Sequence, residues 1–319
     1  MWNRGGHSLQ YDLAIAWCWE YDADFVFQID GECGRRGIHS YLIHPHNLVE
    51  TLHQVENGEL RFKCFFDRAS DQEEDFQQLV DVMQERRVKM INDEDRVVRA
   101  IDKATMQREF SLKGIHVPLT IVLPAWDKRP ELRPIRLDRF GTPFVIKPAC
   151  GGCGDGVVTD ALTPEDIQQA RQEFPDDKYL VQEKIDPVQI NGHRAWFRVF
   201  FSFEEILPCW WDDQTKIADV LSPKEIDKKI YSNIKSIMRK IAHISKLDLF
   251  STEIALTSEG KLMVIDHVND QVDLRKKSSH FDGIPDEVVD RIVINLVNWV
   301  EKHIRRTSTR REPSLCKKI

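Results

Sequence analysis

The sequence has no apolar run that approaches the roughly 18 residues of a membrane span. It also lacks an excess of basic charge, since its 319 residues carry 45 Lys and Arg against 52 Asp and Glu, for a formal net charge of −7. Such a balance provides no positive field for nucleic acid. We therefore expect a protein whose partners are neither membranes nor nucleic acids.

Cysteine is sparse, and the seven cysteines are scattered without a disulfide framework, which suits a reducing compartment. Cys150 and Cys153 form a C-x-x-C pair, but no second pair or histidine cluster accompanies them, which disfavours a zinc site or a redox pair. Residues 1–30 place acidic side chains among the apolar ones, unlike a signal peptide. These features predict a cytoplasmic protein.

The length allows two domains of ordinary size, and the 41% hydrophobic residues predict a sizeable core. Residues 1–91 alternate strand and helix patterns, which predicts a small parallel α/β domain. Its predicted strands are 12–22, 38–43 and 61–67, and its predicted helices are 24–36, 48–55 and 71–86.

A second composition begins at residue 92 and ends in a basic stretch, residues 306–319, which we expect to be disordered. The pattern predicts helices at 95–113, 163–174, 223–245 and 286–303. Predicted strands lie at 117–123, 144–146, 157–159, 178–185, 194–203, 206–212, 248–257 and 261–268.

The segment FVIKPACGGCGDGVVTD, residues 144–160, places Lys147 ahead of a glycine cluster. Glycines allow positive φ and close approach of a ligand to the backbone, as a phosphate cradle requires. The segment is not a Walker loop, because Val157 and Val158 follow the last glycine where that motif has Lys and Ser or Thr. Its flanks are apolar and β-branched on both sides, which excludes a dinucleotide fingerprint and predicts the tip of a β-hairpin.

Oxygen ligands gather late in the chain. If residues 248–257 and 261–268 pair as an antiparallel hairpin around Gly260, Glu253 faces Asp266, and Asn269 follows at the end of the strand. Two carboxylates and an amide suit one or two Mg²⁺ ions. The alternative is that Glu253 and Asp266 are only polar residues at a sheet edge.

Four motifs, taken in order, resemble the ATP-grasp superfamily, particularly its glutathione synthetase-like and RimK-like carboxylate–amine ligases. DKATMQREFSLKGIHVP is similar to the family's DK helix, FVIKPACGGCGDGV to its KP and glycine flap segment, YLVQEKI to its hinge, and WFRVFF to the strand that carries its arginine. The resemblance covers roughly residues 92–280. It implies an α/β (α+β) ATP-grasp fold behind an N-terminal Rossmann-like pre-ATP-grasp domain at 1–91. The ATP-grasp domain would span 92–305, with a lid subdomain at about 105–180 and a C-terminal subdomain at about 181–305.

The resemblance also implies roles for individual residues. Those that would bind the nucleotide are Lys103, Lys147, Gly151, Gly152, Gly154, Gly156, Gln182, Glu183 and Ile185. Catalysis would rest on Arg198 and Lys147, and the metal ligands would be Glu253, Asp266 and Asn269.

Two positions depart from the family pattern. The family usually closes with Glu-x-Asn, whereas this chain has Asp266-x-x-Asn269, so either the strand bulges or His267 takes the usual carboxylate position. Hard Mg²⁺ disfavours His267 as a ligand. An acidic residue often stands two positions before the family arginine, and here that position is Trp196.

The implied activity joins a carboxylate to an amine through an acyl phosphate, with ATP and Mg²⁺ (or Mn²⁺) and release of ADP and phosphate. A small-molecule kinase on the same fold and a non-catalytic ATP-binding module are the alternatives. The expected substrates are a small carboxylate and an amine, such as an amino acid or peptide, and a homodimer stays open because many relatives are dimers. Trp210, Trp211 and Arg275 could contact a substrate, or serve as core and solvated loop residues.

Overall fold

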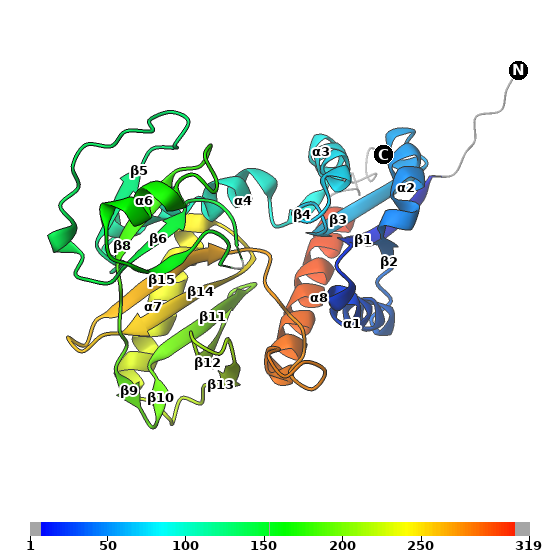
Figure 1. The fold of residues 1–319 in the computed structure, drawn as a ribbon. Coiled ribbons are helices and arrows are strands. Elements are labelled where there is room, and N and C mark those ends of the chain that lie inside the picture. The colour runs from blue at the N-terminus through cyan, green and yellow to red at the C-terminus, as the bar shows by residue number, and fades with distance from the viewer. Residues whose placement is uncertain (1–7, 153, 310–319) are drawn as a thin grey trace, which may run out of the picture. The chain divides into compact units, whose positions relative to one another are not determined.

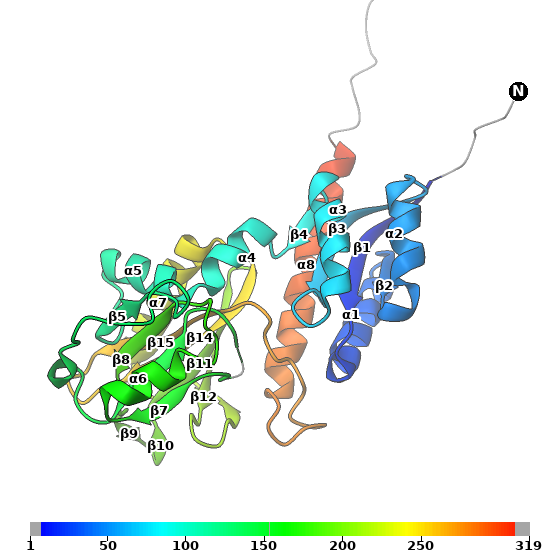
Figure 2. The same ribbon diagram turned by 45° about the horizontal axis from the view of Figure 1, so that its top comes forward.

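The computed structural model describes residues 8–152 and 154–309, which form two compact units (Figures 1 and 2). The first contains the described residues up to Glu94, the turn Ser202–Glu205 and the residues from Asp273 onward. The second contains Asp95–Phe201 and Ile206–Val272. Within the described residues no helix is both long enough and apolar enough to cross a bilayer.

The first unit is built on a four-stranded parallel sheet of order β2-β1-β3-β4. Its elements are β1 (Leu9–Trp17), α1 (Ala23–Arg35), β2 (Ser40–Ile43), α2 (Leu48–Glu56), β3 (Leu60–Arg68), α3 (Gln77–Glu85), β4 (Lys89–Ile91) and α8 (Asp286–Thr309). Leu13, Ala14, Ile15 and Ala16 are completely buried, because helices cover both faces of the sheet. The predicted parallel α/β arrangement of this part is therefore confirmed.

The closing helix α8 packs against α1, β1 and β3 of this first unit. The motifs predict that this helix belongs to the ATP-grasp domain, whereas it packs on the first unit. An amphipathic stripe indicates that a helix is half-buried but does not indicate which sheet buries it. The helix continues to Thr309, four residues into the stretch predicted to be disordered. The rest of that stretch, 310–319, lies outside the described residues, and the domain boundaries stay a proposal.

The second unit contains two larger sheets and a short hairpin. The four-stranded antiparallel sheet, which we call the lid sheet, has the order β5-β8-β6-β7 and carries α6 (Pro164–Ala170). Its strands are β5 (Thr120–Leu123), β6 (Phe144–Pro148), β7 (Val158–Ala161) and β8 (Tyr179–Glu183), and the hairpin is β9 (Gln189–Ile190) with β10 (His193–Arg194).

The five-stranded sheet, which we call the large sheet, has the order β13-β12-β11-β14-β15. Its strands are β11 (Trp196–Ser202), β12 (Glu205–Trp211), β13 (Ala218–Val220), β14 (Leu249–Leu256) and β15 (Leu262–Asn269). One face packs on α7 (Lys228–Ser245), yellow in Figure 1, and on α5 (Lys103–Leu112), and together they enclose the main core of this unit. In β11 and β14, the side chains that do not enter this core therefore point to the opposite face of the large sheet, away from α5 and α7.

The predicted helix 95–113 is two helices, α4 (Glu94–Ile101) and α5. Asp102 separates them, because its side chain accepts hydrogen bonds from the backbone N–H groups of Ala104 (2.9 Å) and Thr105 (3.2 Å) and so caps α5. The short strands β4, β9, β10 and β13 were also not predicted. The cap places Lys103 at the first position of α5.

Candidate functional site

The glycine-rich segment is the tip of a β-hairpin, as predicted, with Phe144 opposite Ala161 and Ile146 opposite Val158. Gly151, Gly154 and Gly156 have φ values of +90°, +86° and +68°, a backbone region that side-chain-bearing residues rarely adopt. The hairpin tip therefore requires glycine at these positions for its own shape.

Lys103 lies beside this tip. Its backbone N–H donates to the carbonyl of Ala149 (2.9 Å), and its Nζ donates to the carbonyl of Gly151 (2.5 Å). The cap at Asp102 thus orients a lysine along the glycine segment, and the charge of Lys103 also acts on Lys147, whose pKa it lowers. The two lysines predicted to bind the nucleotide are therefore close enough to interact electrostatically.

Lys147 extends from the lid sheet to the large sheet. Its neighbours Phe144 and Ile146 face the core of the lid, so Lys147 points away from that core, and its Nζ donates to the carbonyl of Ile265 in β15 (2.9 Å). The side chain is only 6% exposed. Burial lowers the pKa of the Lys147 ammonium to about 8, against the opposing effect of Asp266.

We expect nucleotide affinity to fall as the pH rises through about 8, because the free protein then loses the Lys147 proton. The pKa of this lysine lies below its ordinary 10.5, so an anion that binds it above pH 8 must draw a proton from solution. Calorimetry at pH 9 in two buffers of different ionisation enthalpy measures this uptake. The Lys147→Met variant should take up no proton, and equal uptake by the variant would exclude Lys147 as the source.

The predicted hinge residues lie on and after β8. Gln182 is opposite Val145, on the face of the lid sheet that carries Lys147, and its Nε2 donates to Thr120 Oγ1 (2.9 Å) and more weakly to Gln107 Oε1 (3.4 Å). Glu183 occupies the other face of the strand by alternation, where its Oε1 accepts from the backbone N–H of Leu119 (2.8 Å). Of these two side chains, only that of Gln182 lies on the same face of the lid sheet as the side chain of Lys147.

Ile185 follows the end of β8 and is partly buried. The Glu183 side chain accepts a hydrogen bond from the backbone of Leu119. The predicted contacts of Glu183 and Ile185 with the nucleotide stay predictions.

The carboxylates of the late cluster face each other. Glu253 in β14 pairs with Asp266 in β15, as the sequence predicted, and the next pair along is Ser251 with Asn269. The register shifts on both sides of Glu253, so β15 bulges at this point. The bulge is the first of the two explanations for the unusual Asp-x-x-Asn spacing.

His267 does not take the carboxylate position. Its side chain is fully buried, 5.5 Å from the ring of Phe110 between centroids, and its Nε2 lies 2.7 Å from Gln107 Oε1. Burial holds the pKa of the imidazole well below its usual range, so the ring is neutral. His267 therefore belongs to a buried polar cluster with Gln107 and Gln182 rather than to the carboxylates.

The Glu253 carboxylate lies close to several charged side chains. Its side chain is partly exposed, but protein surrounds it closely enough that desolvation, together with the charge of Asp266, raises the pKa of its carboxyl. Arg198 and Lys216 act in the opposite direction. Two facing carboxylates held in this way favour a divalent cation, which would relieve both desolvation and repulsion.

Arg198 on β11 approaches the same face. Its neighbours Phe197 and Val199 point into the core, so its guanidinium lies on the other side, 4.8 Å from the centre of the Trp211 ring. Among the described residues its Nε is buried without a hydrogen-bond partner. Arg198 thus holds its positively charged guanidinium near Glu253, where its charge opposes the rise in the pKa of that carboxyl.

Sequence reasoning missed three residues of this region: Trp196 as a contact of Glu253, Lys216 as a nearby charge, and Gln107 as the link between His267 and the hinge. In the sequence, Trp196 stands out because it occupies a position that is often acidic in the family. No sequence pattern indicated Gln107 or Lys216. No group of three or more His, Cys, Asp or Glu in the described part of the chain is placed to hold a metal. The predicted ligand set contains only two such residues, Glu253 and Asp266, together with Asn269, and it stays a prediction.

Other candidates for substrate contacts are already engaged. Arg275 donates to Asp273 and Asp282 and lies 5.6 Å from the Trp19 ring centre, all within the first unit. Trp210 is 3% exposed and belongs to the core of the second unit, whereas Trp211 stacks on Arg198.

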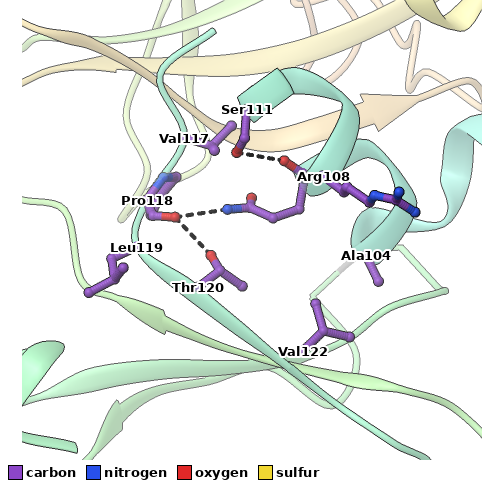
Figure 3. A pocket seen from close by; sticks show the side chains of 9 residues that line it. Ala104, Arg108, Ser111, Val117, Pro118, Leu119, Thr120 and Val122 are labelled. Atoms are coloured by element: carbon purple, nitrogen blue, oxygen red, sulfur yellow. Dashed lines mark hydrogen bonds between the residues drawn. The ribbon is translucent and has the colours of Figure 1, made fainter. Parts of the chain in front are cut away.

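A pocket of about 400 Å³ lies between α5 and the segment 117–122 (Figure 3). Gln107 forms part of its lining and donates to the carbonyl of Pro118 (2.9 Å), to which Thr120 Oγ1 also donates (2.8 Å). Of the residues predicted for phosphate or metal binding, none lines it. The pocket therefore adjoins the buried polar cluster but is separate from the carboxylates.

Solved structures identify the fold. The crystal structure of D-alanine–D-alanine ligase from Bacillus anthracis complexed with ATP matches with a TM-score of 0.67 at 11% identity, over 94% of this chain and 100% of that one. A RimK domain ATP-grasp protein from Sphaerobacter thermophilus matches with a TM-score of 0.63 at 16% identity, over 90% and 99%. The ATP-grasp ligase PsnB, complexed with minimal precursor, Mg and ADP, matches with a TM-score of 0.59 at 13% identity, over 89% and 98%.

This chain has the ATP-grasp fold, as its motifs predicted. No family model matches the sequence. A search of curated proteins finds no match either. The fold is thus evident from structure, while the residue roles depend on the geometry described above.

Proposed function

We propose that this protein is an ATP-dependent ligase that joins a carboxylate to an amine. The observation that carries the proposal is the reach of Lys147 from the lid sheet to the carbonyl of Ile265, next to the facing pair Glu253 and Asp266. This arrangement supports the proposal because an ammonium group lies close to two carboxylates, as phosphate and metal binding require, within a fold shared with ATP-grasp ligases.

In the proposed reaction the substrate carboxylate attacks the γ-phosphoryl group, which gives an acyl phosphate and ADP. The amine then attacks the acyl carbon, and phosphate leaves. Lys103, Lys147 and the amides of the glycine tip bind the phosphates, while Arg198 stabilises the transferring group. Closure of the tip excludes water from the acyl phosphate.

A divalent cation fits the donor set, because Glu253, Asp266 and Asn269 offer only hard oxygens and the two carboxylates face each other. When bound, Mg²⁺ or Mn²⁺ supplies charge neutralisation between the phosphate oxygens. Trp211 stacks on Arg198 and the charge of Lys216 acts on Glu253, and these two residues are the proposed boundary of the acceptor site. The proposed substrates are small carboxylates, amino acids and peptides, and a cytoplasmic location stays part of the proposal.

The test is release of ADP and phosphate with Mg-ATP against pools of carboxylic acids, amino acids and short peptides, with mass spectrometry of the products. We expect turnover that needs both an acid and an amine, yields a condensed product, and disappears in Lys147→Ala and Asp266→Ala. A stable phosphorylated product formed without an amine would instead identify a kinase. Nucleotide binding that is independent of metal and never stimulated by any pool would favour a binding module.

A further inference from the structure

The carboxylate of Glu253 receives a hydrogen bond from a tryptophan. Trp196 begins β11, the strand next to β14 in the large sheet, and its Nε1 donates to Glu253 Oε2 at 2.9 Å. The Trp196 side chain is 8% exposed, so neighbouring groups fix its ring. Among the described residues this indole is the only side chain that donates a hydrogen bond to the Glu253 carboxylate.

The chemistry of the donor determines what it can do at this position. An indole N–H only donates and carries no charge, so Trp196 cannot itself bind a cation. An acidic side chain, which the resembling strands often carry two positions before the arginine, would add a third negative charge beside Glu253 and Asp266. Trp196 instead donates to one oxygen of Glu253 and adds no charge, and the other oxygen has no hydrogen-bond donor among the described residues.

The indole is also well suited to fix geometry. Its ring has two rotatable bonds and is held by packing, whereas the Glu253 side chain has three and sits opposite a like charge. Ligands that are oriented by a neighbouring hydrogen bond bind a metal more tightly than free ones, and loss of such a neighbour typically costs about 10- to 100-fold in metal affinity.

We propose that Trp196 is a positioning residue that orients Glu253 as a metal ligand, in place of the acidic residue found in similar strands. The proposal rests on the metal site of the proposed function. It does not depend on which acid and amine the protein joins.

The experiment measures Mn²⁺ binding directly, by electron paramagnetic resonance of free Mn²⁺ in the presence of a non-hydrolysable ATP analogue. Trp196→Phe keeps an aromatic ring and removes the donor, and we expect the Mn²⁺ concentration for half-saturation to rise about tenfold. Trp196→Gln loses the ring but restores an N–H donor of similar reach. We expect its Mn²⁺ concentration for half-saturation to be closer to that of the parent protein than the value for Trp196→Phe is.

Trp210→Phe is the matched control. The Nε1 of Trp210 is buried without a partner among the described residues, and its ring lies in the core on the other face of the sheet. It should leave Mn²⁺ binding unchanged. Melting temperatures of all variants without metal separate a folding defect from a binding defect.

Unchanged half-saturation in Trp196→Phe would overturn the proposal, as would equal weakening in the Phe and Gln variants, which would assign the effect to ring packing. A parent protein that binds no Mn²⁺ would overturn both this inference and the metal site of the proposed function. A parent protein that binds Mn²⁺ but ligates nothing would count against the ligase alone, and the Mn²⁺ titrations would still decide the role of Trp196.

Discussion

Asp266→Asn is expected to lower the rate of ATP turnover by about 10²- to 10³-fold, because a bound cation contributes several kcal/mol of charge stabilisation at a transferring phosphoryl group. The substitution keeps the size of the side chain and removes one of the two carboxylates that face each other across β14 and β15. Steady-state kinetics over a range of Mg²⁺ concentrations measures the effect. We expect excess Mg²⁺ to recover part of the lost rate if the site still forms.

The matched control is Glu259→Gln at the turn of the same hairpin. Glu259 is exposed and, among the described residues, forms an ion pair only with Lys261 (2.7 Å), so its loss should leave turnover unchanged. The melting temperature of metal-free Asp266→Asn should stay near that of the parent, since the change removes a like charge beside Glu253. Full activity of Asp266→Asn would exclude Asp266 as a ligand.

Arg198→Ala is expected to reduce kcat by about 10²- to 10³-fold, the usual effect of removing one preorganised donor to developing charge. The guanidinium is held 4.8 Å from the centre of the Trp211 ring, so its charge is positioned before any substrate binds. Because the contact would strengthen in the transition state, the KM for ATP should change little. Rapid-quench measurement of phosphoryl transfer separates this step from product release.

Two further variants test whether the effect comes from the planar guanidinium at this position. Arg198→Lys keeps the charge but loses the planar group that stacks on Trp211, and it should recover only a small part of the rate. Arg239→Ala, which changes an exposed arginine on α7, is the control, and its kcat should equal that of the parent protein. A raised KM with an unchanged kcat in Arg198→Ala would mean that Arg198 only binds substrate, and would contradict a catalytic role.

Local patterns were enough to predict both hairpins that carry the site. The β-branched flanks around a glycine cluster predicted the hairpin of β6 and β7. Two apolar strands joined by a turn at Gly260 predicted the pairing of Glu253 with Asp266. Such predictions succeed because the pairing partners lie within a few residues of one turn, so the turn itself sets the register.

Contacts between distant segments could not be predicted in this way. Lys147 reaches a carbonyl that is 118 residues away in the chain, and His267 approaches Gln107 across 160 residues. The local sequence around each residue gives no indication of these distant partners. These contacts depend on how sheets and helices stack, which side-chain periodicity does not record.

By itself, the sequence determined most of the longer strands and helices, the glycine hairpin and the facing carboxylates, because each depends on neighbouring residues and on the alternation of buried and exposed positions. Only the tertiary structure decided that β15 bulges to bury His267, that Trp196 donates to Glu253, and that α8 packs on the first unit. Burial and hydrogen bonding between distant strands determine these features, since an amphipathic element is compatible with more than one partner until the whole chain is packed.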